Sequence, residues 1–427
     1  MLKAQHLFIV FLVPSFFTIA CSNSESYVDA SLEHNVADAY FVENTLGEIT
    51  FQEYTNYIPF NDSAYPYIGL PRINIETAWP IKDKETEVPG LLQVWGKDSS
   101  ETGLLNLTIK GRGNTTWAYP KKPYTITFDK KTPFLGMPAA KKWILLANYR
   151  DRTLMRNSIA FEIANRTQLV WTPSGKFAEV FLNGKFLGCY FVCEKIEVKK
   201  NRLELSEKSY LLEFDTYYDA DYKFRTTLND LPVNIKYPKA IDDSSFSFIQ
   251  NYIDSIETAL QQSSNSLDYL NYIDQESFAD YLIVYALATN SEPGHPKSVY
   301  MHKDGDGKLV AGPVWDFDYY TFNIQRNGFT NRYSQLFKHL IKKNAFKTVL
   351  AERWDTYKPE FEGLFDFVDS LANYTATANE RNIKLWPIKI EQNLIGDEEK
   401  TFDESIDMLK KCIRKRIDEL DTLIKTL

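Results

Sequence analysis

"KFAEVFLNGKFLGCYFVCEKI", residues 176–196, contains two apolar runs that flank the dipeptide Asn183-Gly184. An Asn-Gly pair supplies the two positive-φ positions that a tight hairpin turn requires. The runs on either side are rich in β-branched and aromatic residues, which favour strands. The stretch therefore predicts an antiparallel hairpin. The residues that flank it are then expected to belong to a sheet rather than to a helical bundle.

Short alternating runs precede this hairpin, and one more follows it. They are "LPRINIET" (70–77), "LLNLTIKG" (104–111), "PYTITFD" (123–129), "WILLANY" (143–149) and "SYLLEFD" (209–215). Alternation of apolar and polar residues over a few positions indicates half-buried strands. Residues 66–215 are therefore predicted to form a strand-rich N-terminal lobe.

One helix is expected among these strands. The stretch "DRTLMRNSIAFEIANRTQL" (151–169) repeats apolar residues at helical spacing, including Leu154, Ile159 and Ile163. Asp151 precedes them at a position where its carboxylate can cap the first turn. The pattern predicts a single amphipathic helix between two groups of strands.

Beyond residue 240 the periodicity becomes helical, in residues 245–262, in residues 277–290 and through most of residues 331–427. A short hairpin is expected within residues 298–318, turning at the "DGDG" of residues 304–307. We predict a helix-rich C-terminal lobe, in which 216–330 carries the polar loops and 331–427 is the helical C-terminal region. The expected fold is α+β, with ligand binding where the two lobes meet.

Composition narrows the classes of protein. The chain has 427 residues, of which 44% are hydrophobic and 15% aromatic, which suffices for a large packed interior. A formal net charge of -8 argues against non-specific nucleic-acid binding. Cys189 and Cys193 lie four residues apart on one predicted strand, about 13 Å, which is too far for a disulfide. With five His and no CxxC or HExxH pattern, a structural zinc site is not expected.

The N-terminus predicts export. A lysine precedes an apolar run at residues 7–20, which is shorter than a membrane span and typical of a signal peptide over residues 1–20. Ala20-Cys21 and the following Ser/Asn tract resemble a bacterial lipoprotein cleavage site, which implies lipid on the Cys21 thiol. Residues 21–65 would then be a tether to the cell envelope. A plain signal peptide cleaved nearby is the alternative.

Two stretches of the N-terminal lobe are candidates for binding an anion. In "KGRGNTTW" (110–117), glycines flank Arg112, so that backbone amides and a guanidinium can approach a phosphate together. The alternative is a tight turn with Asn114 in the left-handed conformation. In "YPKKPYTITF" (119–128), either Lys121 or Lys122 can point inward, and an inward lysine needs a negative partner.

The candidate partner of this lysine is Glu162, on the helix expected within residues 151–169, with Arg156 near the same face. Two solvated lysines at the entry of a strand are the alternative, and composition alone favours it.

A polar loop, "TNSEPGHPKSVYMHK" (289–303), separates a predicted helix from a predicted strand. It concentrates Asn290, Glu292, His295 and Lys297. A carboxylate in such a loop can orient a hydroxyl group and accept its proton, while Asn290 or His295 orients the carboxylate. The loop is therefore a candidate catalytic segment.

The stretch "GPVWDFDYYTF" (312–322) places Asp316 and Asp318 two residues apart after a predicted strand. In an extended segment the two carboxylates would share a face, while Phe317 would point the other way. Such a pair can ligate Mg²⁺. An Asx-turn that ends the strand is the alternative.

Taken together, these stretches resemble the CotH kinase family, relatives of the spore coat protein H kinases. The motifs "GRGNTTWAYPKKPYTITF", "FLGMPAAKKWILLANYRDRTLMRNSIAFEIA", "EVFLNGKFLGCYFVCEKI" and "NSEPGHPKSVYMHKDGDGKLVAGPVWDFD" carry the resemblance in consistent order over roughly residues 70–330. The resemblance implies an atypical protein-kinase-like fold with two lobes. It also implies binding of ATP and Mg²⁺, and phosphorylation of Ser/Thr hydroxyls on exported proteins.

The resemblance also implies roles for single residues. The loop of Arg112, Gly113 and Asn114 would cover the phosphates, and Asp316 would bind Mg²⁺ with support from Asp318. Lys122, more than Lys121, would contact phosphate and pair with Glu162 on the helix that also carries Arg156. The segment around Cys193, Glu194 and Ile196 would be the hinge that meets the adenine.

The catalytic-base position departs from the family pattern, because members commonly carry Asp where this chain has Glu292. Glutamate is one methylene longer, and phosphoryl transfer depends strongly on positioning. Two functions therefore remain open. One is an active kinase with Glu292 as base, assisted by Asn290, His295 and Lys297. The other is a weak or inactive kinase-fold module in cell-surface binding or assembly.

Overall fold

The structure is a computed structural model. It describes residues 63–294, 296–318, 320–329, 335–388, 396–397 and 399–427, together with two short paired strands, β1 (Phe41–Glu43) and β2 (Ile49–Phe51). The predicted signal peptide, the lipidation at Cys21, most of the predicted tether and His295 lie outside the described residues.

The strand-rich part is a closed barrel with strand order β3-β4-β5-β6-β7-β9-β8. Antiparallel neighbours make up most of it, and parallel pairing of β3 with β8 closes it. The predicted hairpin at Asn183-Gly184 is confirmed as β8–β9. The strands are β3 (Arg72–Thr77), β4 (Val88–Trp95), β5 (Leu105–Gly111), β6 (Tyr124–Phe134), β7 (Met137–Leu146), β8 (Gly175–Leu182) and β9 (Lys185–Glu194).

The barrel encloses its own apolar core. Side chains that alternate along the strands meet inside it, including Ile73, Ile126, Trp143 and Val180, all at most 1% exposed. The opposite faces of β8 and β9 pack outward on the second, larger core. Cys189 and Cys193 belong to that outer packing and are free thiols, which confirms the prediction that they form no disulfide.

The second sheet has five strands in the order β11-β12-β10-β13-β14. The strands are β10 (Tyr210–Phe214), β11 (Lys223–Arg225), β12 (Pro232–Tyr237), β13 (Val299–Lys303) and β14 (Leu309–Ala311). The hairpin turn predicted at residues 304–307 is confirmed as the β13–β14 connection.

The sequence analysis grouped β10 with the preceding strands, whereas β10 pairs with β12 and β13 and so belongs to the second sheet. Strands β11 and β12 were not expected, because they are short and β12 begins with a proline. Neither provides the long alternating run on which strand prediction depends.

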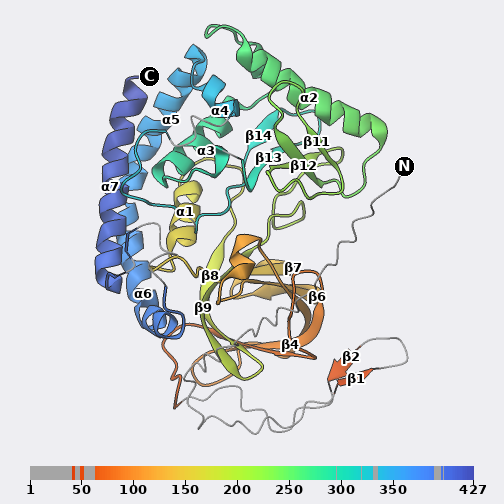
Figure 1. Cartoon of the computed structure of the whole chain (residues 1–427), viewed down its shortest axis with the longest axis vertical. Coiled ribbons are helices and arrows are strands. Elements are labelled where there is room, and N and C mark those ends of the chain that lie inside the picture. Colours follow the sequence, from red (N-terminus) through yellow and green to blue (C-terminus); the bar gives the residue numbers. More distant parts are fainter. Residues whose placement is uncertain are drawn as a thin grey trace, which may run out of the picture.

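Helices surround the second sheet. They are α1 (Arg156–Asn165), α2 (Asp243–Gln261), α3 (Gln275–Leu287), α4 (Gln335–Leu340), α5 (Asn344–Glu362), α6 (Leu364–Leu385) and α7 (Phe402–Lys425), with 3-10 turns η1 (Thr115–Ala118), η2 (Asp268–Asn271) and η3 (Glu292–Gly294). Helix α3 is buried from Ser277 to its end at Leu287, and α7 lies along one side of the molecule (Figure 1). Helix α6 runs down from this helical part and packs against β9 of the barrel (Figure 1).

The helix predicted within residues 151–169 is α1, but it is shorter than the apolar pattern suggested. Leu154 has a φ of 63° and lies before the helix. The N-cap residue is Met155 and not Asp151 as expected, although the Asp151 carboxylate accepts a hydrogen bond from the amide of Arg156, the first residue of the helix (2.8 Å).

An α+β fold with a strand-rich N-terminal part and helices in the C-terminal part is confirmed. The closed barrel was not foreseen, and the division into the predicted domains stays a prediction. In the part of the chain that the structure describes, no helix is long and apolar enough to cross a membrane.

Candidate functional site

A cleft of about 670 Å³ lies between the barrel and the second sheet. The barrel contributes the β5–η1 segment with Arg112, Gly113 and Asn114, and the segment after β7. The opposite side is formed by the ends of β10 and β13 and by the loop after β14. Segments that are distant in sequence therefore meet at the junction where the sequence analysis expected a ligand.

The two sides of the cleft carry opposite charge. Most of the basic side chains come from the barrel region, and the acidic ones all come from the C-terminal side. The basic group on the barrel side is Lys84, Lys110, Arg112, Lys121 and Arg150. The acidic group is Glu213, Asp215, Asp219, Glu292, Asp316 and Asp318, with Lys236 and Lys297 among them. Such an arrangement suits a ligand that combines phosphates with a divalent cation.

The loop after β5 contains a glycine that its backbone conformation requires. Gly113 has a φ of 79°, and a Cβ there would overlap the Thr116 hydroxyl, so this position requires glycine. The alternative, a tight turn with Asn114 in the left-handed conformation, is wrong, because Asn114 has a φ of -95°. The Arg112 guanidinium lies over the Trp315 ring, 5.6 Å from its centroid, and so reaches across to the segment that carries Asp316.

Asp316 and Asp318 both line the cleft as predicted, but the segment is not extended. Asp316 has a φ of 68°, a left-handed conformation that is uncommon for a non-glycine residue. Phe317 points into the core and is fully buried. Burial, repulsion by Asp316 and a hydrogen bond to Asp316 raise the pKa of Asp318 to about 8, and burial also raises the pKa of Asp316.

Glu292 lies beside these carboxylates, at the start of η3. It is 8% exposed, and burial followed by repulsion from Asp316 raises the pKa of Glu292 to about 8. The side chain of Asn290 connects the two segments, because its Nδ2 donates to the Asp316 carbonyl (2.8 Å) and its Oδ1 accepts from the Glu292 amide (2.8 Å). Asn290 therefore links the backbone of Glu292 to that of Asp316, while the predicted orientation of the Glu292 carboxylate by Asn290 or His295 stays a prediction.

Lys297 is the cation nearest to this acidic group on its own loop. Its charge opposes the rise in the pKa of Glu292, and its ammonium lies 5.1 Å from the centroid of the Tyr217 ring. Its backbone amide donates to the Glu292 carbonyl (3.3 Å). Lys297 can thus balance charge beside Glu292.

The predicted pair of Lys122 and Glu162 is wrong. Lys121 is the inward lysine, fully buried, and its Nζ donates to the Ala147 carbonyl (2.7 Å), to Asn382 Oδ1 (2.7 Å) and to the Cys189 carbonyl. Lys122 instead donates to the Trp117 carbonyl (2.7 Å). A proline follows directly, and which of two adjacent side chains faces inward depends on the turn before it, which alternation does not specify.

Glu162 itself and two more residues predicted for the site have partners within the fold. Glu162 forms an ion pair with Arg166, one turn later on α1 (2.8 Å). Arg156 is fully buried between Asp151 and Asp397. Glu194 ends β9, and its carboxylate accepts hydrogen bonds from Arg202 and from the Ser174 amide, while the role of the segment around Cys193, Glu194 and Ile196 as a hinge stays a prediction. These residues support the fold around the cleft rather than line it.

The sequence analysis missed several side chains that line the cleft: Asn157, Glu213, Asp215, Lys236, Tyr300 and Trp315. Asn157 Oδ1 accepts from the Phe317 amide (3.0 Å), between the two aspartates. A signal for Glu213 and Asp215 was present, because "LLEFD" (211–215) repeats the pattern of "VWDFD" (314–318), two acids around a phenylalanine at a strand end.

The donor set fits a hard divalent cation. In the described part of the chain, no group of three or more His, Cys, Asp or Glu side chains is suited to enclose a metal ion by itself. Mg²⁺ usually takes one or two carboxylates and completes its shell with water and phosphate oxygens. Asp316 and Asp318 offer those carboxylates, since both line the cleft beside Glu292.

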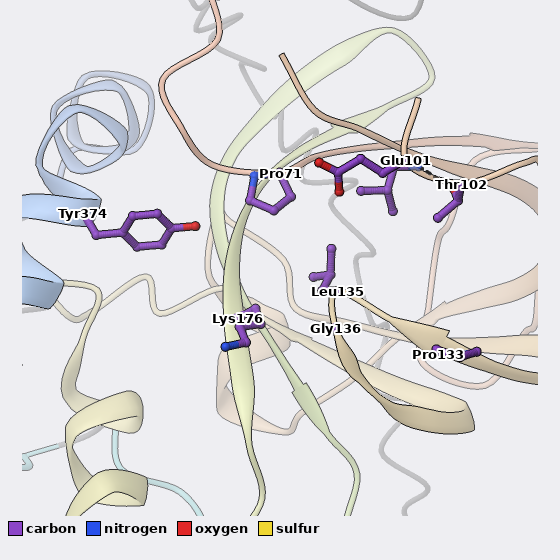
Figure 2. A pocket seen from close by; sticks show the side chains of 9 residues that line it. Pro71, Glu101, Thr102, Pro133, Leu135, Gly136, Lys176 and Tyr374 are labelled. Atoms are coloured by element: carbon purple, nitrogen blue, oxygen red, sulfur yellow. Dashed lines mark hydrogen bonds between the residues drawn. The ribbon is translucent and has the colours of Figure 1, made fainter. Parts of the chain in front are cut away.

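A second hollow, of about 330 Å³, lies between the barrel and α6. Figure 2 shows Tyr374 of α6 facing Pro71, Lys176 and Glu101 across it. Its lining has no residue in common with the cleft and none of the residues predicted for the site. The cleft is therefore the candidate functional site.

The fold and the cleft define an α+β protein whose charged groups suit phosphate and a divalent cation. A family model described as CotH kinase protein matches residues 109–420, and the chain therefore belongs to the CotH kinase family. No curated protein matches the chain significantly.

Proposed function

We propose that this protein is a kinase that uses Mg²⁺ to transfer phosphate from ATP to Ser/Thr hydroxyls of other proteins. The observation that carries the proposal is the single cleft in which Arg112, Asp316 and Glu292 meet, with a basic barrel side facing an acidic floor. Membership of the CotH kinase family supports the same reaction class.

Each residue of the cleft would have a role in the reaction that follows from the chemistry of its side chain. The Arg112 guanidinium and the glycine-containing loop would bind phosphate oxygens. Asp316 and Asp318 would bind Mg²⁺, which when bound supplies positive charge that stabilises the transferring phosphoryl group. Asn157 and Asn290 fix the backbone of this segment through the Phe317 amide and the Asp316 carbonyl.

Glu292 would orient the acceptor hydroxyl. The hydroxyl oxygen forms a bond to the γ-phosphorus, the bond between that phosphorus and the bridging oxygen of ADP breaks, and the hydroxyl proton passes to Glu292. Lys297, beside Glu292, would balance the charge of the glutamate before transfer.

The proposal also covers the lobes of the fold, the location of the protein and its attachment to the cell envelope. The barrel would serve as the N-lobe of an atypical kinase-like bilobal fold, and the second sheet with its helices as the C-lobe. The protein would be exported, attached to the cell envelope by lipid at Cys21, and would act on exported proteins. The N-terminal signal pattern supports this location.

One observation favours a second function, a kinase-fold module with weak or no catalysis. Glu292 is buried, and its pKa is raised to about 8, so at neutral pH it is mostly protonated and is a poor proton acceptor. Cation binding at Asp316 would remove part of the repulsion and lower this pKa. The two functions therefore differ in turnover rather than in the ability to bind nucleotide.

The first experiment measures thermal unfolding with ATP and Mg²⁺. A ligand at about 100 times its Kd stabilises the folded state by roughly 2.7 kcal/mol, so the wild-type protein should unfold several degrees higher. Asp316→Ala should abolish this shift, while Asp369→Ala, at a surface aspartate paired with Lys410, should keep it. If no nucleotide shifts the wild-type protein, both functions are wrong.

The second experiment separates the kinase from the binding module. The protein is incubated with ATP labelled at the γ-phosphate and with a Ser/Thr-containing acceptor protein. Label transfer that disappears in Asp316→Asn supports the kinase. A nucleotide-dependent thermal shift without any transfer supports the module.

A further inference from the structure

The acidic floor of the cleft contains a carboxylate that the proposed reaction leaves without a role, Asp215. It directly follows β10, lines the cleft and is 6% exposed. Neighbouring Glu213 has a basic partner, because Lys236 Nζ lies 2.9 Å from its carboxylate. Asp215 is satisfied differently, by backbone amides.

The two oxygens of Asp215 accept hydrogen bonds from two separate segments. Oδ1 accepts from the Tyr217 amide (2.7 Å), in the turn that Asp215 begins. Oδ2 accepts from the Ser298 amide (3.0 Å), at the end of the loop that carries Glu292 and Lys297. The Thr216 amide reinforces this contact by donating to the Pro296 carbonyl (3.0 Å).

Ser298 needs such an anchor. It has a φ of 51°, a left-handed conformation that is unfavourable for serine and persists only when surrounding contacts impose it. The backbone amide of the preceding residue, Lys297, donates to the Glu292 carbonyl (3.3 Å), so a shift of Ser298 would also move Glu292. Asn290 fixes the beginning of the same loop, and Asp215 fixes its end.

We propose that Asp215 is a positioning residue for phosphoryl transfer, which sets the place of Glu292 and Lys297 over the cleft by anchoring the Ser298 amide. This inference rests on the proposed kinase function. A displacement of about 1 Å at reacting groups can cost two orders of magnitude in rate, so loss of this anchor should lower turnover far more than nucleotide binding.

The chain offers a matched control at the other end of the same strand pair. Strands β10 and β13 are antiparallel, and Asp304 follows β13 as Asp215 follows β10. The Asp304 carboxylate likewise accepts from a backbone amide, that of Ser206 (2.7 Å), and from the Ser209 hydroxyl (2.8 Å). Asp304 therefore also anchors a loop, although it is exposed and accepts through Oδ1 alone, and it does not line the cleft.

The experiment compares Asp215→Asn and Asp304→Asn in the full chain. At Asp215, asparagine keeps one acceptor oxygen but turns an N–H toward one of the two backbone donors, so the anchor is weakened without emptying the site. At Asp304, the amide oxygen of asparagine can replace Oδ1, so this variant removes the charge and keeps the anchor. Asp215→Asn should lower the melting temperature by a few degrees, and Asp304→Asn should unfold close to wild type. Only Asp215→Asn should lower kcat, by about 10- to 100-fold, with the Kd for ATP and Mg²⁺ within about threefold of wild type.

Hydrogen exchange supplies a readout that does not depend on activity. Peptides covering residues 290–298 should exchange faster in Asp215→Asn and at the wild-type rate in Asp304→Asn. Unchanged exchange of these peptides in Asp215→Asn overturns the inference. A kcat within about threefold of wild type, or an equal loss of kcat in Asp304→Asn, also overturns it.

Results that contradict the role of Asp215 can be told apart from results that contradict the proposed kinase function. If the wild-type protein neither binds nucleotide nor transfers phosphate, the kinase proposal and the catalytic role of Asp215 fall together. The exchange measurement would then still show whether Asp215 anchors the loop.

Discussion

Lys121 carries the most unusual single-residue environment in the described part of the chain. Its ammonium is fully buried, donates to three oxygens and lies 4.4 Å from the centroid of the Tyr190 ring. Burial lowers the pKa of Lys121 from 10.5 to about 7, while the oxygens and the ring face favour the charged form. The groups around it do not titrate near neutral pH, since burial raises the pKa of Cys189 to about 12 and that of Tyr190 well above its usual range.

This environment predicts a dependence of stability on pH. Between pH 7 and 10.5 the unfolded chain binds a proton at Lys121 that the folded chain has largely released. Stability therefore rises with pH through this window, by at most about 1.4 kcal/mol per pH unit, and below the window the contribution is constant. Lys121→Met removes the titration, so the stability of wild type relative to this variant should increase from pH 7 to pH 9.

Denaturant unfolding of both proteins at several pH values measures this difference and cancels the titration of other groups. A difference that stays constant with pH would mean that the three acceptor oxygens keep Lys121 charged throughout, contrary to the prediction.

At the residue scale, sequence patterns predicted the positions of the acidic side chains of the cleft better than those of the basic side chains. Asp316, Asp318 and Glu292 stand in loops next to apolar runs, and the ends of buried strands meet at a cleft. Lys121 and Lys122 are adjacent, so nothing in their spacing decides which one is buried. Asp215 was missed because its role depends on Ser298, 83 residues later in the chain.

At the scale of elements, the contact between β9 and α6 is unusually close. Gly188 has a φ of 87° at a bulge in the β8–β9 pair. A Cβ added there would lie 2.5 Å from Asn382 Oδ1, the same oxygen that accepts from Lys121. The glycine therefore lets α6 reach the base of the cleft.

Gly188→Ala should cost more stability than the matched variant Gly184→Ala. Both glycines lie in the β8–β9 hairpin with positive φ, but Gly184 has no atom within 4 Å of an added Cβ. Gly184→Ala should cost about 1 kcal/mol from backbone strain. Gly188→Ala adds overpacking against Asn382, for a further loss of about 2 kcal/mol in denaturant unfolding. Equal losses of stability in the two variants would show that α6 shifts at little energetic cost to make room for the added methyl group.

Elements with strong local signals were predicted correctly, and those without were not. The β8–β9 hairpin has an Asn-Gly turn and long apolar runs, and the β13–β14 hairpin has a glycine-rich turn. Strand β11 has three residues and no such turn. Helix α1 was overextended because Leu154 continues the apolar pattern while its backbone is left-handed.

For the whole molecule, sequence patterns could not predict that the barrel closes or how it is attached to the helices. The closing pair, β3 with β8, joins segments about 100 residues apart, and alternation does not specify a partner strand. The attachment depends on ion pairs that only the folded chain assembles. The clearest of these connects α6 with the barrel, where Arg381 Nη1 donates to both carboxylate oxygens of Glu179 (2.9 and 3.0 Å).

Glu179 is a buried carboxylate that depends on this arginine. Its side chain is fully buried and that of Arg381 is 17% exposed. Burial raises the pKa of Glu179, and Arg381 opposes the rise. Removing one partner of a buried pair leaves an uncompensated charge, so Arg381→Gln should lower the free energy of unfolding by about 3 kcal/mol.

Arg414→Gln is the control for this variant, because Arg414 pairs with Glu362 at the surface, where the two side chains are 48% and 40% exposed. Exposed pairs contribute about 0–1 kcal/mol, so this variant should unfold close to wild type. Because Glu179 lies on β8, the strand that closes the barrel, loss of Arg381 weakens the barrel and its junction with α6 together. Calorimetry should therefore show a lower melting temperature for Arg381→Gln only, and equal melting temperatures for the two variants would contradict a stabilising role of this ion pair.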